Sequence, residues 1–258
     1  MTEATQIWAA INTAQHRTAV DIQPKRYPLT QTEFEVQISV GGKTLSHKLR
    51  RPTLAELVTR ESESVTEVEE VSPGEDAFHV EDKAATARLW DKIRLQVKGY
   101  RTGDAKPDEW IDVTPELAAK LPADHKVAAV RALYLFRVEM VEDEGDGFDL
   151  DGQEYDIRQL IGGDEDAPEY MIVHRLRQPT EQQRRDYERR ASATTFSTGS
   201  KKRKMKFRAN LKADVELYDA LFVSLTGATP PDKGAVDPIV KRQVVQCLLG
   251  KISASVLD

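Results

Sequence analysis

The sequence lacks the features that cross-link a chain or anchor it in a membrane. Among 258 residues there is one cysteine, Cys247, which excludes an internal disulfide. No uncharged apolar run reaches the roughly 18 residues that a membrane-spanning helix needs. The N-terminus has neither the basic start nor the apolar run of a signal peptide. We therefore expect an intracellular protein that folds by burying an apolar core.

Sequence signatures of catalysis and of cofactor binding are also missing. There is no glycine-rich phosphate loop ending in Lys-Ser or Lys-Thr, and no G-x-S-x-G nucleophile motif. The five histidines are scattered and form no closely spaced metal-ligand cluster with the cysteine. An acidic stretch at 143–152 resembles a calcium loop, but its register places Gly147 and Arg158 where carboxylates are required. The sequence therefore predicts a protein that is not an enzyme, with no catalytic residue, no metal site and no cofactor.

An internal repeat is the clearest positive feature. The segment 47–53 recurs at 174–180, 127 residues later, with five of seven residues identical. Further matches follow in the same order, which a duplication explains better than coincidence. They set 89–93 against 217–221, Gly99 against Gly227 and, more weakly, Lys126, Val130 and Leu133 against Lys241, Val245 and Leu248.

Each copy begins with the pattern of a β-hairpin. Apolar residues alternate with polar ones from Phe34 to Val40, which is typical of a strand with one buried face. Gly41 and Gly42 then supply a tight turn, and the alternation continues to Leu49. The second copy repeats this arrangement with a strand at 155–161, a turn near 162–163 and a strand at 170–176.

A helix start follows each hairpin. Thr53 and Thr180 stand after a proline, with Glu56 and Gln183 three residues later, which is the spacing of a capping box. Apolar residues at steps of three and four predict further helices at 84–97, 122–135, 213–225 and 238–256. We therefore expect an α+β fold, a tandem duplication of a β-hairpin followed by about three helices. The predicted organisation is a first repeat at 1–142, an acidic linker at 143–153 and a second repeat at 154–258.

The two copies differ in charge at equivalent places. Residues 54–82 contain ten acidic residues and one basic residue, whereas 181–214 contain eleven basic and four acidic residues. Charge runs are often only solvated faces, but opposite charges at matching places also favour contact between the elements. The acidic element of one molecule would then meet the basic element of the next, or the two elements would meet within one chain. The acidic candidates are Glu61, Glu63, Glu67, Glu69, Glu70, Glu75 and Asp76, and the basic candidates are Arg184, Arg185, Arg189, Arg190, Lys201, Lys202, Arg203, Lys204, Lys206 and Arg208.

The basic tract at 201–208 permits an alternative function. Its lysines and arginines could follow a phosphate backbone, with Phe207 available to stack on a base. The long acidic segments elsewhere would repel nucleic acid. Nucleic-acid binding as an accessory protein is therefore the alternative hypothesis, and a host regulatory adaptor is a second one.

The end of the first hairpin carries a recognisable motif. It reads Lys48-Leu49-Arg50-Arg51-Pro52-Thr53 and is followed by Leu54-Ala55-Glu56-Leu57. This arrangement resembles the small tail-assembly chaperones of tailed phages, whose strand commonly runs into a Leu-Arg-x-Pro helix start. The resemblance covers 34–58, with a weaker echo at 155–187, and the duplication departs from those usually smaller, single-copy proteins.

This resemblance implies a non-catalytic role in building a virion. It implies binding to a tail or tape-measure component, and a virion component such as a tail, neck or capsid-lining protein is equally compatible with it. We therefore expect a phage or prophage assembly or structural protein, whose partners are other virion proteins or further copies of itself in a head-to-tail oligomer. The expected location is the cytoplasm of a bacterial host, or the virion.

Overall fold

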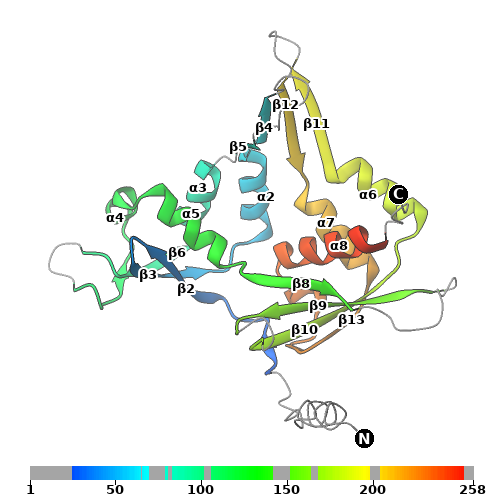
Figure 1. The fold of residues 1–258 in the computed structure, drawn as a ribbon, viewed down its shortest axis with the longest axis horizontal. Helices are drawn as coiled ribbons and strands as arrows, with labels where there is room; N and C mark the ends of the chain where they lie inside the picture. The colour runs from blue at the N-terminus through cyan, green and yellow to red at the C-terminus, as the bar shows by residue number, and fades with distance from the viewer. Residues whose placement is uncertain are drawn as a thin grey trace, which may run out of the picture.

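Three four-stranded antiparallel sheets carry the architecture, and their strand orders are β2-β3-β6-β7, β13-β10-β9-β8 and β11-β12-β4-β5 (Figure 1). The computed structural model describes residues 25–64, 66–69, 79–80, 83–101, 106–141, 152–163, 168–197 and 204–252. No helix within these ranges is long and apolar enough to cross a membrane. The predicted α+β class is confirmed.

Both predicted hairpins are present. In the first repeat, β2 (Glu33–Val40) pairs with β3 (Lys43–Arg50), and Gly41 and Gly42 make the turn with φ angles of 56° and 75°. In the second repeat, β9 (Glu154–Ile161) pairs with β10 (Tyr170–Arg177). Left-handed φ angles at both turn positions are what a tight hairpin requires, and glycine adopts them without strain.

Both predicted helix starts are also confirmed. In α2 (Leu54–Glu63), the Thr53 hydroxyl accepts from the backbone N–H of Glu56, whose carboxylate accepts from the backbone N–H of Thr53. In α6 (Glu181–Ala191), Thr180 and Gln183 exchange the same two hydrogen bonds, at 3.2 and 2.9 Å. The two reciprocal bonds satisfy backbone donors that the first turn of a helix leaves without a partner.

Two of the other predicted helices end sooner than expected. Helix α3 (Lys83–Ile93) stops four residues before the end of the predicted segment, and α7 (Leu211–Leu221) also stops four residues early. The next residues form β6 (Arg94–Lys98) and β13 (Phe222–Thr226), which pair with β3 and β10. Val97 follows Ile93 by four residues, a spacing that predicts a helix. A residue in a strand can face the same core, so this spacing alone does not separate the two structures.

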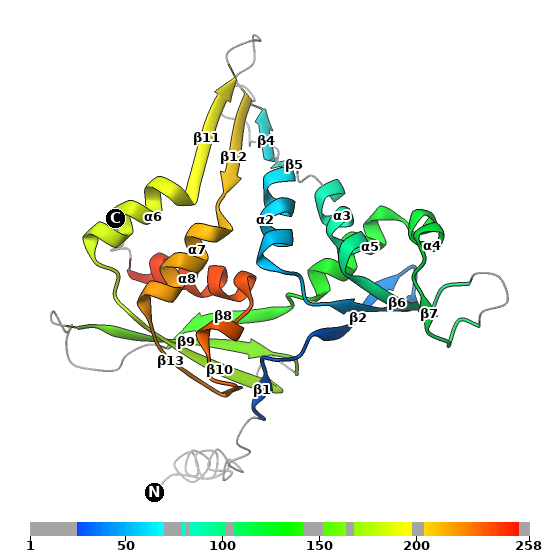
Figure 2. The ribbon, with the colours of Figure 1, turned by 180° about the vertical axis from the view of Figure 1, so that it is seen from behind.

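Helices cover one face of the first sheet, β2-β3-β6-β7, and one face of the second sheet, β13-β10-β9-β8 (Figures 1 and 2). On the first sheet lie α3 and α5 (Ala123–Ala132), and on the second lie α7 and α8 (Pro238–Ile252). Three further short elements are β7 (Ile111–Asp112), α4 (Pro115–Lys120) and the 3₁₀ helix η1 (Lys233–Ala235). Each sheet and its helices enclose a separate apolar core, one centred on Trp90 and the other on Tyr218.

The repeat extends to fine structural detail. The pairing of β3 with β6 shifts register between Lys48 and Leu49, and the pairing of β10 with β13 shifts at the equivalent place, between Arg175 and Leu176. Lysine to aspartate ion pairs also recur, Lys126 with Asp91 at 2.8 Å and Lys241 with Asp219 at 2.6 Å. These lysines are largely buried, and each lies over the aromatic ring at position 90 or 218. Equivalent irregularities are strong support for a duplication, because chance similarity would not reproduce them.

Short segments cross between the repeats. Strand β8 (Phe136–Met140) lies in the range expected for the first repeat, yet it pairs with β9 in the second sheet. Strand β1 (Tyr27–Pro28) pairs in parallel with β14 (Ala228–Thr229) of the second repeat. Most of the predicted linker at 143–153 lies outside the described residues, and the division into 1–142 and 154–258 stays a prediction. These crossings tie the repeats together at their sheets.

Gly99 and Gly227 provide a test of the repeated architecture. Both follow the third strand with positive φ, at 94° and 77°. A Cβ on Gly227 would collide with the carbonyl oxygen of Met171, and one on Gly99 would lie 2.9 Å from the carbonyl oxygen of Thr44, the equivalent residue. The close approach of two backbones therefore requires glycine at both places.

We predict that Gly227→Ala lowers the free energy of unfolding by about 2 kcal/mol or more, because it combines this collision with a strained φ. Gly250→Ala is the control, since Gly250 lies in α8 with open space around it. Alanine favours a helix over glycine by about 1 kcal/mol, so the control should be stabilised. Urea unfolding followed by circular dichroism measures both. A Gly227→Ala protein as stable as the wild type would contradict the prediction.

Candidate interaction surface at the repeat junction

The acidic and basic elements meet within one chain. Strand β12 (Lys204–Ala209) pairs antiparallel with β4 (Thr66–Glu69), and the register sets Lys204 opposite Glu69 and Lys206 opposite Glu67. Strand β11 (Ser192–Ser197) adds to the other side of β12, and β5 (His79–Val80) adds to β4. Opposite charges at directly paired positions stabilise an antiparallel pair by about 0.2–1 kcal/mol. The structure thus realises the intrachain form of the predicted contact.

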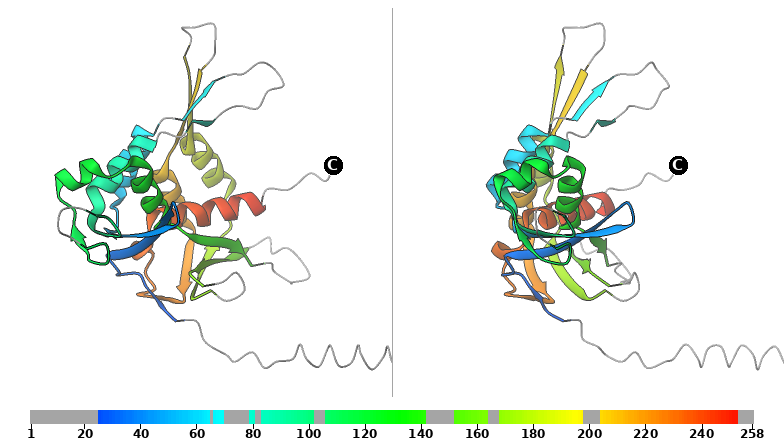
Figure 3. Two further views of the ribbon diagram at one scale, coloured as in Figure 1. Left: turned by 60° about the vertical axis from the view of Figure 1, so that its left-hand side comes forward. Right: turned by 90° about the vertical axis from the view of Figure 1, so that its left-hand side faces the viewer.

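This composite sheet stands out from the body of the protein (Figure 3). One hairpin comes from each repeat, inserted between equivalent helices: β4 and β5 between α2 and α3, and β11 and β12 between α6 and α7. Of the basic tract at 201–208, Lys204, Lys206 and Arg208 belong to β12. The basic residues of β12 are therefore part of a paired strand between two others.

The predicted site residues that the structure describes lie on four elements. The acidic residues lie at the end of α2 and in β4, and the basic residues lie in α6 and β12. On α2 and β4 are Glu61, Glu63, Glu67 and Glu69, while on α6 and β12 are Arg184, Arg185, Arg189, Arg190, Lys204, Lys206 and Arg208. Outside the described residues are Glu70, Glu75, Asp76, Lys201, Lys202 and Arg203.

A buried ion cluster joins the repeats at the base of the composite sheet. The guanidinium of Arg242 on α8 contacts Glu61 of the first repeat at 2.5 Å and Asp214 of its own repeat at 2.7 Å. The exposed fractions of these side chains are 17, 14 and 4%. Asp214 also accepts a hydrogen bond from Tyr187 of α6, at 2.8 Å. Of the predicted acidic residues, Glu61 therefore makes the best-defined contact with the other repeat, and its partner Arg242 was not predicted.

Leu211 reinforces the same contact. It is 1% exposed and packs in the apolar core of the first repeat, although it begins α7 of the second. Its backbone N–H donates to the second carboxylate oxygen of Glu61 at 2.7 Å. A carboxylate at the start of a helix is favoured because the first-turn amides are free and the helix dipole is positive there. Glu61 thus receives hydrogen bonds from two elements of the other repeat.

The junction is head-to-tail rather than two-fold symmetric. The first repeat contributes α2 and β4, whereas the second contributes α7, α8 and β12, which are not the equivalent elements. Each repeat also has a surface equivalent to the one that its neighbour uses in the junction, and these two free surfaces do not carry the same residues. Lys83, the equivalent of Leu211, is exposed and ion-paired with Asp124, and Glu188, the equivalent of Glu61, is exposed. The residues that form this junction are therefore specific to the contact between the two repeats of one chain.

Helix α6 differs sharply from its equivalent α2. No residue of α6 is buried, whereas Leu57 of α2 is 2% exposed and its equivalent is Arg184. Three of the four predicted arginines on α6 have local ion pairs. These join Arg185 to Glu181, Arg189 to Asp186 and Arg190 to Glu216. Local pairing reduces the charge that α6 offers to an acidic partner.

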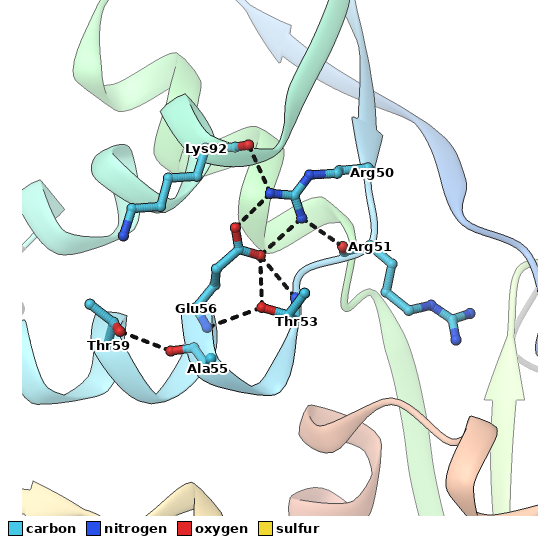
Figure 4. Close-up of polar contacts among 7 residues, drawn as sticks. All are labelled: Arg50, Arg51, Thr53, Ala55, Glu56, Thr59 and Lys92. Carbon is cyan, nitrogen blue, oxygen red and sulfur yellow. Dashed lines mark hydrogen bonds and ion pairs between the residues drawn. The ribbon is translucent and has the colours of Figure 1, made fainter.

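The Leu-Arg-Arg-Pro-Thr motif forms a rigid corner in the first repeat (Figure 4). The Arg50 guanidinium contacts both carboxylate oxygens of Glu56, at 2.9 and 2.5 Å, and also donates to the carbonyl oxygens of Arg51 and Lys92. The hydrogen bonds from Arg50, together with those from Thr53, lower the pKa of Glu56 to about 2. The motif thereby fixes the angle between β3 and α2 and ties both to the end of α3. A bidentate arginine to carboxylate pair suits this role because its geometry is directional.

A buried histidine with an aromatic partner is repeated in both cores. The Nδ1 atom of His47 accepts from the indole N–H of Trp90 at 3.2 Å, which leaves the proton of the neutral ring on Nε2, beside Tyr100 at 3.1 Å. His174 has the hydroxyl of Tyr218 at 2.8 Å and the side-chain oxygen of Gln159 at 3.3 Å. Burial lowers the pKa of His47 to about 4 and that of His174 to about 3. Both histidines are therefore neutral packing residues.

Comparison with protein-family models, curated proteins and solved structures finds no match. Within the described residues, no group of three or more histidine, cysteine, aspartate or glutamate residues could hold a metal ion. The chemistry that the junction offers is therefore strand pairing and salt-linked packing between repeats.

We predict that Glu61→Ala lowers the free energy of unfolding by about 3 kcal/mol, because it removes one of the two carboxylates that pair with Arg242 and leaves the Leu211 N–H without its acceptor. Glu188→Ala is the matched control at the same position of α6, and its effect should stay within about 0.5 kcal/mol. Guanidinium unfolding gives both values. Equal effects of the two substitutions would show that Glu61 has no special role in the junction.

The buried histidines predict a loss of stability in acid. Because the folded-state pKa values lie below the unfolded value of about 6.5, the unfolded state binds more protons as the pH falls. The contribution of the two neutral histidines to the free energy of unfolding is thus fully present above pH 6.5. It is lost as the pH falls from there toward 4 and 3, with a slope of up to about 1.4 kcal/mol per pH unit for each histidine. Urea unfolding of wild type and His174→Gln between pH 7.5 and 4.5 should give a shallower slope for the variant. Identical slopes would refute this interpretation.

Proposed function

We propose that this chain is a non-enzymatic phage or prophage assembly or structural protein, a tail-assembly factor or virion component that acts through protein–protein contacts. One observation carries the proposal. The molecule builds a sheet from both repeats that stands clear of the helices, with a strand edge available on β11 (Figure 3). A projecting sheet of this kind contributes little to either core and is suited to contact another protein.

The edge of β11 has the properties of a docking strand. Within the described residues β11 pairs only with β12, so its other side presents backbone donors and acceptors. Natural proteins usually protect such edges with charge or proline. The sequence of β11, Ser-Ala-Thr-Thr-Phe-Ser, contains neither. An added strand from a partner would complete the sheet, which is a common mode of protein recognition.

The resemblance to tail-assembly chaperones supports the same role. The residues that carry it, Arg50, Pro52 and Thr53, form the strand-to-helix corner described above. The corner holds α2 in place, and α2 leads directly into the composite sheet. Under this proposal the partner is another virion protein or, by continuing the head-to-tail arrangement, a second copy. The protein then acts in the cytoplasm of the bacterial host or within the virion.

The alternative of nucleic-acid binding receives less support. Lys204 and Lys206 stand in register with glutamates of β4. A phosphate backbone would have to compete with these carboxylates and would be repelled by the acidic first repeat. Protein contact through the uncharged β11 edge avoids both costs.

Genetic complementation tests the proposal. Disruption of the gene in a phage or induced prophage should prevent completion of infectious particles, with incomplete structures visible by electron microscopy. The wild-type gene should restore the titre, whereas Thr194→Lys with Phe196→Lys, which adds charge to the β11 edge, should not. The control is Gln37→Lys with Ser39→Lys, at exposed positions of the edge strand β2.

An unchanged titre of complete particles after disruption would overturn the proposed function. Full rescue by the β11 variant would instead retain the assembly role and reject β11 as the docking edge. Purified variants must unfold at the same urea concentration as the wild type, so that a failure to complement reports on contact rather than on folding.

A further inference from the structure

A cavity between the two repeats has the chemistry of a ligand site. Its volume is about 70 Å³, and its walls come from β1, β2, the corner after β3, the connection from α5 to β8, β9 and the start of α8. Leu135 lines the cavity and is 74% exposed, so the cavity reaches the surface there. The apolar lining includes Leu29, Phe34, Phe136 and Ile161.

Two hydrogen-bond donors in this cavity have no partner. Within the described residues, the Nε atom of Arg51 and the hydroxyl of Tyr134 are buried and make no hydrogen bond. Buried donors are rarely left without an acceptor, because each costs about 1–3 kcal/mol. Burial also raises the pKa of the Tyr134 phenol, which therefore keeps its proton and can donate. The cavity is thus short of acceptors.

Arg51 makes no direct ion pair within the described residues, although the Asp237 carboxylate is close enough to interact with it electrostatically. The Nη1 atom of Arg51 donates to the carbonyl oxygens of Leu29 and Ala235, at 2.7 and 3.1 Å, but no carboxylate of the described residues lies within ion-pair distance. Asp237 lines the cavity as well, yet its carboxylate accepts from the backbone N–H of Ile239 at 2.8 Å and caps α8. A partly buried guanidinium with one free N–H is well suited to bind an anionic oxygen.

We infer that this cavity binds a short aliphatic carboxylate, with the carboxylate on Arg51 and Tyr134 and the alkyl group among the apolar walls. The size limits the alkyl group, since a cavity of about 150 Å³ accepts benzene and this one is about half as large. The same chemistry is offered by a free acid and by the C-terminal residue of a polypeptide. The site goes beyond the proposed assembly role and does not depend on it.

Isothermal titration with propanoate tests the free acid, and a five-residue peptide ending in alanine tests the polypeptide source. We expect saturable binding with a Kd on the order of 1 mM for the acid. The neutral alcohol propan-1-ol and the C-terminally amidated peptide should bind at least about tenfold more weakly, because they lack the anion. Tighter binding of the peptide than of the acid would identify a chain terminus as the ligand, and equal binding would identify a small acid.

Two variants locate the site. Tyr134→Phe removes only the hydroxyl and should weaken carboxylate binding about fivefold or more. Ile161→Trp fills the apolar end and should abolish it. Arg51→Gln is a third variant, although it also removes the contacts to Leu29 and Ala235. Absence of binding by both ligands, equal affinity for acid and alcohol, or unchanged affinity in both Tyr134→Phe and Ile161→Trp would each overturn the inference.

Discussion

The joint between the repeats depends on charge complementarity that is enclosed within one chain. Arg242 lies between Glu61 and Asp214 with little exposure to solvent, and above this cluster an acidic strand pairs with a basic strand. A buried ion cluster gains stability only when all its members are present, because each remaining charge loses its compensation if another is removed. The position of α2, and with it the base of the composite sheet, follows from this cluster and from Leu211 beside it.

The duplication explains why the joint can be asymmetric. Identical copies would have to use the same residues at the internal contact and at the free ends of the molecule. Fusion into one chain removed that requirement, and the equivalent positions diverged. Glu61 is half-buried while Glu188 is exposed, and Leu211 fills the first core while Lys83 lies at the surface. The free ends therefore no longer match the internal contact, and β11 is left as an uncharged edge strand among the described residues.

Much of the fold could be predicted because its determinants are local. The hairpins follow from alternation and glycine, and the helix starts follow from the capping boxes at Thr53 and Thr180. The strands β6 and β13 could not be separated from the preceding helices, since an apolar residue such as Val97 fits either period. The alternation of charged and apolar residues from Lys204 to Ala209 is typical of a strand, but the cluster of positive charge drew the interpretation toward a binding tract. The role of Arg242 depends on a contact 181 residues away along the chain. The cavity at Arg51 also joins distant segments, so no local pattern could have shown it.

Disulfide trapping of β4 against β12 tests the intrachain joint most directly. Residues directly opposite in an antiparallel pair have Cα atoms about 4.5–5.5 Å apart, within disulfide reach. With Cys247→Ser as background, Glu67→Cys and Lys206→Cys should oxidise to a single bond within a monomer, seen by mass spectrometry of cleaved protein. Glu67→Cys with Thr195→Cys, placed two strands apart in the same register, should not. Disulfide bonds between chains, or none at all, would contradict a joint built from the two repeats of one molecule.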